Sequence, residues 1–288
     1  MTMAPILMSL KKFIKENKLS GKFYFVATPI GNLDDMSIRA IKTLEQVDEI
    51  FCEDTRHSIK LLNNFNIKKP LKSYHKFNYK EVITQIVDKL KQGLNLALIT
   101  DAGTPAISDP GSELIEHFVK EQIAYTIIPG ATASVNAYAL SGFTAGFTFL
   151  GFLPEKQKEK EEVLKEVKNH KTALLFYSAP HDLEKELQLM LNYLGNRKIV
   201  IVRELTKLYE EIIHTSLHEG YQKEPRGEFV IVVEGQTQTE QNELDSLTLD
   251  EHLNYYLNLK YTKNEAIKQI AKDKKTTRQE VYNALIKK

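Results

Sequence analysis

The sequence predicts an α/β protein built from two consecutive lobes, followed by a small helical tail. Apolar runs of strand length alternate with segments of helical period through most of the chain, which indicates sheets covered by helices. The alternation restarts near residue 145, which indicates a second lobe. The last forty or so residues lack strand-like runs and carry helix-capping patterns instead.

In the first lobe, each strand-like run leads into a helix-like segment. The expected strands are 23–27, 49–53, 94–100 and 124–128. The expected helices are 37–47, 57–65, 81–93 and 112–122. The apolar runs are continuous rather than alternating. Strands buried on both faces have this character, so we expect a mostly parallel sheet with helices on both sides.

The second lobe repeats this organisation without a detectable sequence repeat. Its expected strands are 147–153, 172–179, 198–205 and 227–235, with helices over 155–170 and 182–195. The predicted domains are an N-terminal extension (1–22), an N-terminal lobe (23–143), a C-terminal lobe (144–235), a polar linker (236–248) and a tail (249–288).

The tail is basic, and it contains two predicted helix starts. Thr262 with Glu265 and Thr277 with Glu280 have capping-box spacing. Residues 260–288 contain nine Lys or Arg against three acidic residues, whereas the whole chain has a formal net charge of only +1. A basic end on a neutral chain suits a polyanion such as RNA, although a solvated helical hairpin would have the same pattern.

Composition favours a cytoplasmic globular protein. The 42% apolar content is enough for a real core, and Cys52 is the single cysteine, so no internal disulfide can form. We expect Cys52 to be a core residue. No apolar run approaches the roughly 18 residues of a membrane helix. The N-terminal lysines follow the short apolar piece, which is the wrong order for a secretory signal.

Three turns rich in Gly and Pro follow predicted strands of the first lobe. They are TPIGNLDD after 23–27, DAGTPAISDPG after 94–100 and PGATAS after 124–128. Ligands of open parallel sheets bind beyond the carboxyl ends of the strands, and Gly there lets backbone approach a ligand closely. We therefore expect a ligand site at this edge, although ordinary turns also use Gly and Pro.

Charged residues also cluster at strand ends. FCEDTRHS (51–58) brings acid, base and hydroxyl groups together, and RELTK (203–207) and FYSAPHD (176–182) do so in the second lobe. A helix cap with a surface ion pair would explain the first cluster equally well. Sequence patterns for nucleotide phosphates, for metal ligands and for a serine nucleophile are absent, so we expect no metal.

Taken together, six motifs resemble the bacterial ribosomal RNA small-subunit methyltransferase I family, within the tetrapyrrole-methylase superfamily. In order, they are TPIGNLDDMSIRA, EDTRH, DAGTPAISDPG, PGATA, GFLP and RELTK. The resemblance implies the two-lobed tetrapyrrole-methylase fold with a ligand cleft between the lobes. It also implies S-adenosylmethionine (SAM) as methyl donor and 2′-O-methylation of a cytidine in the decoding region of 16S ribosomal RNA.

The resemblance also implies where the ligands bind. The donor-binding positions correspond to Leu33, Asp101, Gly103, Thr104, Thr132 and Ala133 in the first lobe and to Phe176, Tyr177 and Leu205 in the second. EDTRH and RELTK would face the acceptor, with Asp54, Arg56 and His57 as the candidate catalytic residues. Glu53 and Lys207 are further candidates for a general base, and the sequence does not choose among them.

The implied partners are the small ribosomal subunit and a second copy of the chain. Lys272, Lys274, Lys275 and Arg278 of the tail are the candidate RNA-binding residues. Two alternatives remain open at this stage. One is a methyltransferase acting on a tetrapyrrole, and the other is a nucleic-acid-binding protein whose body senses a ligand.

Overall fold

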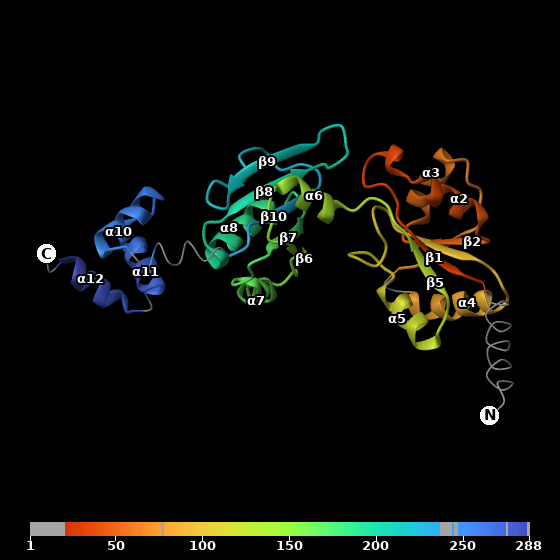
Figure 1. The fold of residues 1–288 in the computed structure, drawn as a ribbon, viewed down its shortest axis with the longest axis horizontal. Helices are drawn as coiled ribbons and strands as arrows, with labels where there is room; N and C mark the ends of the chain where they lie inside the picture. Colours follow the sequence, from red (N-terminus) through yellow and green to blue (C-terminus); the bar gives the residue numbers. More distant parts are fainter. Residues whose placement is uncertain (1–20, 76–77, 237–243, 245–246, 275, 287–288) are drawn as a thin grey trace, which may run out of the picture.

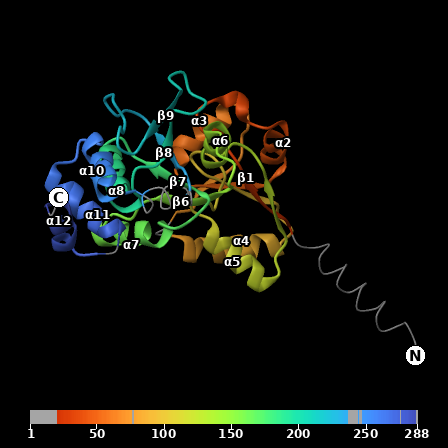
Figure 2. The same cartoon turned by 60° about the vertical axis from the view of Figure 1, so that its left-hand side comes forward.

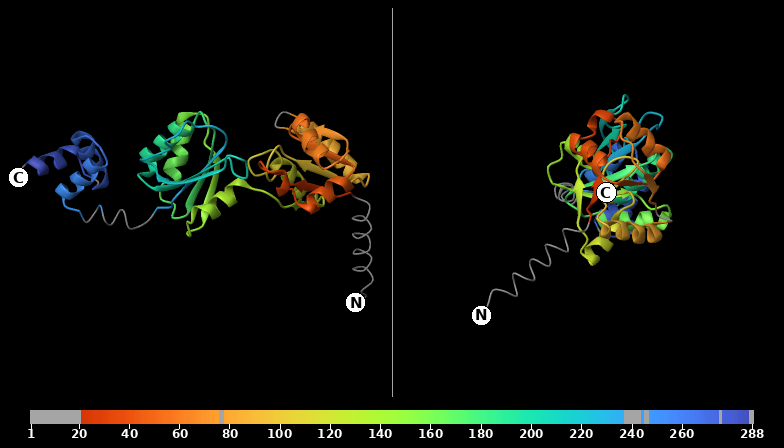
Figure 3. Two further views of the ribbon diagram at one scale, coloured as in Figure 1. Left: turned by 90° about the horizontal axis from the view of Figure 1, so that it is seen from above. Right: turned by 90° about the vertical axis from the view of Figure 1, so that its right-hand side faces the viewer.

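The protein consists of two α/β lobes and a helical tail arranged in a row, with the tail beyond the second lobe (Figures 1 and 3). The computed structural model describes residues 21–75, 78–236, 244, 247–274 and 276–286. The predicted N-terminal extension, apart from Gly21 and Lys22, and most of the predicted linker lie outside these described residues.

The first lobe is a five-stranded parallel sheet covered on both faces. Its elements are β1 (Phe23–Val26), η1 (Leu33–Asp35), α2 (Ile38–Gln46), β2 (Glu49–Cys52), α3 (Thr55–Asn64), β3 (Leu71–Ser73), α4 (Tyr79–Lys91), β4 (Leu96–Ile99), α5 (Ser112–Glu121) and β5 (Tyr125–Ile128). The strand order is β3-β2-β4-β1-β5, and every pair is parallel. The predicted parallel sheet is therefore confirmed for this lobe.

Both faces of the first sheet are buried, as the continuous apolar runs indicated. Phe23 and Phe25 pack with α4 and α5, which lie on one side, while Val26 and Ile50 pack with α2 and α3 on the other (Figure 2). Cys52 belongs to the second of these clusters and is fully buried. Burial raises the pKa of its thiol, in keeping with a core residue.

The second lobe contains a mixed sheet, which differs from the first. Its elements are α6 (Ala133–Ser141), β6 (Phe147–Phe152), α7 (Gln157–Val167), β7 (Ala173–Ser178), α8 (Leu183–Leu194), β8 (Lys198–Arg203), β9 (Glu211–Ser216) and β10 (Phe229–Val233). The strand order is β6-β7-β10-β8-β9. Only β6 and β7 pair in parallel, and the other three pairs are antiparallel.

The helix α6 connects the two lobes. It lies within the range predicted for the N-terminal lobe, but its buried Ala137 packs with Leu175, Val200 and Val232 of the second sheet. The helices α7 and α8 cover the opposite face of the same sheet. A division of the chain by packing therefore falls just before α6 rather than after it.

The tail is a bundle of three helices: α10 (Leu249–Asn258), α11 (Lys263–Asp273) and α12 (Arg278–Ile286). Both predicted capping boxes are present, at Thr262 with Glu265 and at Thr277 with Glu280. Helix α10 was not predicted from the sequence, although Thr248 and Glu251 form a third capping box at its start. Ile267, Ile270, Ala271 and Val281 form a core separate from those of the lobes.

Candidate functional site

A cavity of about 320 Å³ lies between the two lobes. The first lobe contributes Ile30 after β1, residues 102–104 and 107–109 after β4, and Thr132 after β5. The three turns singled out from the sequence thus meet at one site, because the carboxyl ends of parallel strands share an edge of the sheet. The second lobe contributes the ends of β6, β7 and β8 and the start of β10.

Hydrogen bonds tie these turns to one another. Thr28 and Gly103 form an isolated bridge, with N–H···O distances of 2.9 and 3.1 Å in the two directions. The hydroxyl of Thr104 donates to the carbonyl of Ala131 at 3.1 Å. Gly103 has φ +80°, which favours glycine, and a Cβ on Gly130 would lie 2.9 Å from that of Ala27. The glycines therefore allow the close packing that shapes the cavity wall.

Asp101 stands at the start of the central turn. It is not among the residues that line the cavity, but its neighbour Ala102 is. Its Oδ1 atom is buried and has no hydrogen-bond partner within the described part of the chain. An unpaired buried carboxylate oxygen is costly in free energy unless a ligand supplies a donor. Asp101 is therefore suited to accept a hydrogen bond from a bound molecule.

The other predicted donor-binding residues lie in three different environments: the cavity wall, the exposed surface and the core of the second lobe. The residues that line the cavity are Gly103, Thr104, Thr132, Ala133, Tyr177 and Leu205. Leu33 lies in η1 with 43% of its surface exposed. The side chain of Phe176 is fully buried in the core beneath α7 and α8. Because neighbouring side chains of a strand point to opposite faces, Phe176 faces away from Tyr177 and the cavity.

Residues 227–230 also line the cavity, whereas the sequence predicted them only as part of a strand. Gly227 has φ +85°, and a Cβ there would lie 2.4 Å from Oε1 of Glu204. A glycine immediately before a buried strand was the available indication of close packing at this point.

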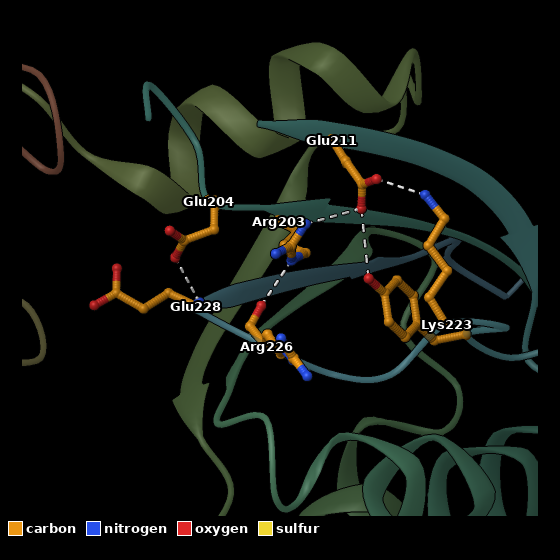
Figure 4. A network of polar contacts seen from close by, with 7 residues as sticks. Arg203, Glu204, Glu211, Lys223, Arg226 and Glu228 are labelled. Atoms are coloured by element: carbon orange, nitrogen blue, oxygen red, sulfur yellow. Dashed lines mark hydrogen bonds and ion pairs between the residues drawn. The ribbon is translucent and has the colours of Figure 1, made fainter. Parts of the chain in front are cut away.

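The RELTK turn joins the cavity rim to the first lobe. Lys207 forms ion pairs of 2.9 Å with both Glu204 and Glu228. Oε1 of Glu204 also accepts from the backbone N–H of Glu228 (Figure 4). A Cβ on Gly31 of the first lobe would lie 2.4 Å from Cγ of Lys207. Burial lowers the pKa of Lys207, but its two carboxylate partners outweigh this effect, and the pKa lies above its ordinary value.

Arg203 extends this network away from the cavity. Its guanidinium donates to the carbonyl of Arg226 at 2.6 Å and to Glu211 at 3.2 Å, and Glu211 also pairs with Lys223 (Figure 4). These contacts fix the base of the turn before β10, so Arg203 has a structural role in this state of the protein.

The EDTRH cluster is organised as a helix cap. Asp54 is the N-cap of α3, accepting from the backbone N–H of Arg56 at 2.8 Å, and it pairs with the Arg56 guanidinium at 2.7 Å. These hydrogen bonds lower the pKa of Asp54 to about 2. Arg56 has 89% of its side chain exposed, and His57 is also exposed. The structure thus shows the cap and ion pair that the sequence left as one of two possibilities.

The candidate RNA-binding residues of the tail differ in exposure. Lys272 and Arg278 are exposed, whereas Lys274 is half-buried and donates to the carbonyl of Leu247 at 3.0 Å. Lys275 lies outside the described residues. In the described part of the chain, no helix is long and apolar enough to cross a membrane, and no three His, Cys, Asp or Glu side chains are grouped to hold a metal ion.

The fold and the cavity between its lobes define a class of methyltransferase. The chain belongs to the family of tetrapyrrole (corrin/porphyrin) methylases, whose sequence profile matches residues 22–220. Solved structures share this fold. A cobalt precorrin-4 methyltransferase has a TM-score of 0.54 at 19% identity, covering 74% of this chain and 94% of its own. A diphthine synthase has a TM-score of 0.61 at 14% identity, covering 76% and 91%.

Within this family, the chain is similar over most of its length to proteins named ribosomal RNA small subunit methyltransferase I. The relative from Halalkalibacterium halodurans is 45% identical over 271 residues, which cover 91% of this chain and 94% of the relative. The relative from Bacillus subtilis is 43% identical, covering 92% and 94%. These similarities confirm the family predicted from the six sequence motifs.

Proposed function

We propose that this protein transfers a methyl group from SAM to the ribose 2′-oxygen of a cytidine in the decoding region of 16S ribosomal RNA. The observation that carries the proposal is the similarity over nine-tenths of the chain to ribosomal RNA small subunit methyltransferases I. Such a substrate would place the enzyme in the cytoplasm.

The cavity fits a donor of this size and chemistry. Its volume of about 320 Å³ lies at the lower end of ligand pockets, roughly 300–1,000 Å³, and its walls combine apolar side chains with a few polar groups. The unpaired Oδ1 of Asp101 would accept from an ammonium or hydroxyl of the donor. Bound SAM would supply a methyl group activated by the positive charge on sulfur.

The chain's main contribution to catalysis would be orientation. The linked turns at Gly103, Thr104 and Thr132 would hold the donor from the first lobe, and Tyr177 and Leu205 would hold it from the second. Holding two reactants in line is worth about 7–11 kcal/mol of barrier in well-oriented systems. Rigid cavity walls would therefore supply much of the rate acceleration.

A general base must accept the proton of the acceptor hydroxyl, and the pKa shifts exclude some of the candidate bases. Asp54, with a pKa of about 2, is a weak base at neutral pH. Lys207 has a raised pKa and is therefore protonated, so it is unsuited to accept a proton. Glu53 and His57 remain as candidates of the same cluster, with Arg56 placed to bind a phosphate.

The tail would provide affinity for the RNA. Exposed cations such as Lys272 and Arg278 neutralise phosphates, which gives strong but sequence-independent and salt-sensitive binding. Shape and ribosomal context would then supply the specificity that the neutral lobes do not provide through charge.

A second copy of the chain is the proposed partner at an apolar surface near the lobe junction. Edge strand β5 exposes Tyr125 and Ile127 by 39% and 47%, and the following helix α6 exposes Val135 by 46%. Phe147, on the edge strand β6, is 39% exposed. Apolar exposure of this kind on consecutive elements is typical of protein interfaces rather than of RNA-binding surfaces.

The test of the proposed reaction uses methyl-labelled SAM and small ribosomal subunits that lack the modification. After transfer, the RNA is hydrolysed in alkali, which needs a free 2′-hydroxyl for cleavage. Label in an alkali-resistant dinucleotide containing cytidine is the expected result. Label in mononucleotides would show that a base is methylated, and the absence of label from RNA despite SAM binding would overturn the proposal.

A further inference from the structure

Strand β6 contains a β-bulge directly before the GFLP motif, whose Phe152 lines the cavity. Strand β6 pairs with β7 so that Phe149 lies opposite Leu175 and Gly151 opposite Phe176, which leaves one extra residue on β6. Gly151 has φ +67°, a conformation that favours glycine. Bulges of this kind re-aim the side chains that follow them and are common next to active sites.

The bulge reverses the direction of Phe152. Residues three apart on a regular strand point to opposite faces, yet Phe149 and Phe152 both contact Tyr177, with ring centroids 5.0 and 5.4 Å away. Leu150 and Leu153 likewise share the core beneath α7 and α8. Without the bulge, Phe152 would point into that core instead of toward the cavity.

Phe152 is therefore held in place and yet accessible. It lines the cavity, 61% of its surface is exposed, and its ring meets that of Tyr177 edge to face at 64°. From the first lobe, Ile107 lines the same cavity and is 57% exposed. A Cβ on Gly151 would lie 3.7 Å from Oγ of Ser108, so the two elements meet there. Their exposure places both side chains at the cavity mouth.

We propose that Phe152, with Ile107 opposite, forms a stacking site for the base of the acceptor nucleotide. The inference rests on the proposed function, since it assigns a role toward that RNA. A ribose that reaches into the cavity must leave its helix, and its base then loses its stacking partners. Aromatic side chains at the entrance replace those contacts in single-stranded RNA recognition.

The exposure of Phe152 favours the acceptor base over the donor's adenine. Ligand pockets bury most of a small molecule's surface, so a wall for the donor is expected deep in the cavity. A side chain that remains more than half exposed at the rim is accessible to a group that arrives from outside. Aromatic stacking also requires no charge, in agreement with the apolar character of Phe152 and Ile107.

The test compares Phe152→Ala, Phe152→Leu and Phe152→Tyr in methyl transfer to unmodified small ribosomal subunits. Stacking of one base on an aromatic ring gives an expected loss of kcat/KM of roughly 5- to 100-fold in the Ala and Leu variants. The Tyr variant should retain nearly wild-type activity. The Kd for SAM, measured by calorimetry, should stay within about twofold of wild type in all three.

Tyr209→Ala is the matched control, because this aromatic side chain of the same lobe is 68% exposed and does not line the cavity. Wild-type kcat/KM in Phe152→Leu, or an equal loss in Tyr209→Ala, would overturn the stacking role. A parallel rise in the Kd for SAM would assign Phe152 to the donor and also overturn it. If the wild-type enzyme itself labels no cytidine ribose, the proposed function fails, and the inference fails with it.

Discussion

Asp101 shows how a single residue can be prepared for a ligand. Its Oδ1 atom is buried without a partner in the described structure, and the next residue in the chain, Ala102, lines the cavity. A buried acceptor of this kind has a free-energy cost in the ligand-free protein, which a donor group on the ligand would offset. A substitution of Asp101 therefore tests the proposed donor site directly.

We predict that Asp101→Ala weakens SAM binding by roughly 10- to 100-fold, the effect of losing one hydrogen bond to a charged group. Calorimetric titration with SAM measures this directly. Asp34→Ala is the control, because this acidic residue lies exposed in η1. Wild-type affinity in the Asp101 variant would remove Asp101 from the donor site.

Asp54 illustrates the opposite case, a charged residue whose contacts indicate a structural role. We predict that Asp54→Asn, which keeps a side-chain cap, reduces methyl transfer by less than the roughly 100-fold expected from loss of a general base. A larger loss with unchanged thermal stability would restore Asp54 as a catalytic residue.

The same variant has a defined pH dependence. In the folded protein the pKa of Asp54 is about 2, which is below its ordinary value of 3.8. The ionised carboxylate therefore stabilises the folded state fully at pH values above 3.8. This contribution is lost as the pH falls toward the folded value. The difference in melting temperature between wild type and Asp54→Asn should therefore shrink from pH 5 to pH 3, and a constant difference would contradict the ion pair.

At the scale of elements, the turn after β1 meets the turn after β8. Gly31 of the first lobe lies against Lys207 of the second, and Lys207 is held on both sides by Glu204 and Glu228. An added methyl group on Gly31 must therefore displace an anchored side chain, and with it the rim of the cavity that includes Glu228.

We predict that Gly31→Ala lowers methyl transfer by roughly 10- to 100-fold, because small displacements of a catalytic site have effects of this size. Gly220→Ala is the control, since Gly220 has φ +65° but no atom within 4 Å of the added Cβ. The kcat/KM of both variants measures the effect, and equal values would show that the contact between the lobes has no functional role.

At the scale of the whole molecule, the tail has a hydrophobic core of its own. Its core residues Ile267, Ile270 and Val281 form a cluster of their own, distinct from the clusters of the lobes. We predict that deletion of residues 249–288 leaves SAM binding unchanged and lowers activity on ribosomal subunits, with a weaker dependence on salt. Calorimetry and methyl transfer at two salt concentrations test this, and unchanged activity would exclude a role in RNA binding.

The proposed dimer is tested at its apolar surface. We predict that Ile127→Lys combined with Val135→Lys converts a dimer into a monomer, because two buried charges without partners oppose association. Sedimentation at several concentrations measures the change. Gln122→Lys on the surface of the first lobe, where the side chain is exposed, is the control. A wild-type protein that sediments as a monomer at working concentration would contradict the proposal.

Elements with strong local patterns were predictable from the sequence, and elements that depend on their surroundings were not. The strands β1, β4, β7 and β8 were found because they are continuous apolar runs. In contrast, β3 (Leu71–Ser73) is a short edge strand, α6 consists mainly of small residues, and β9 carries polar residues among its apolar ones. Their structure is stabilised by contacts with a sheet that no local window of sequence contains.

The sequence by itself determined the two lobes, the parallel first sheet, the basic tail and the family, because these follow from local patterns and ordered motifs. Only the tertiary structure decided the antiparallel pairings of the second sheet, since runs buried on both faces do not specify direction. It alone also placed Phe176 in the core, capped α3 with Asp54 and brought Gly227–Val230 and Phe152 to the cavity. These features depend on contacts between residues far apart in the chain.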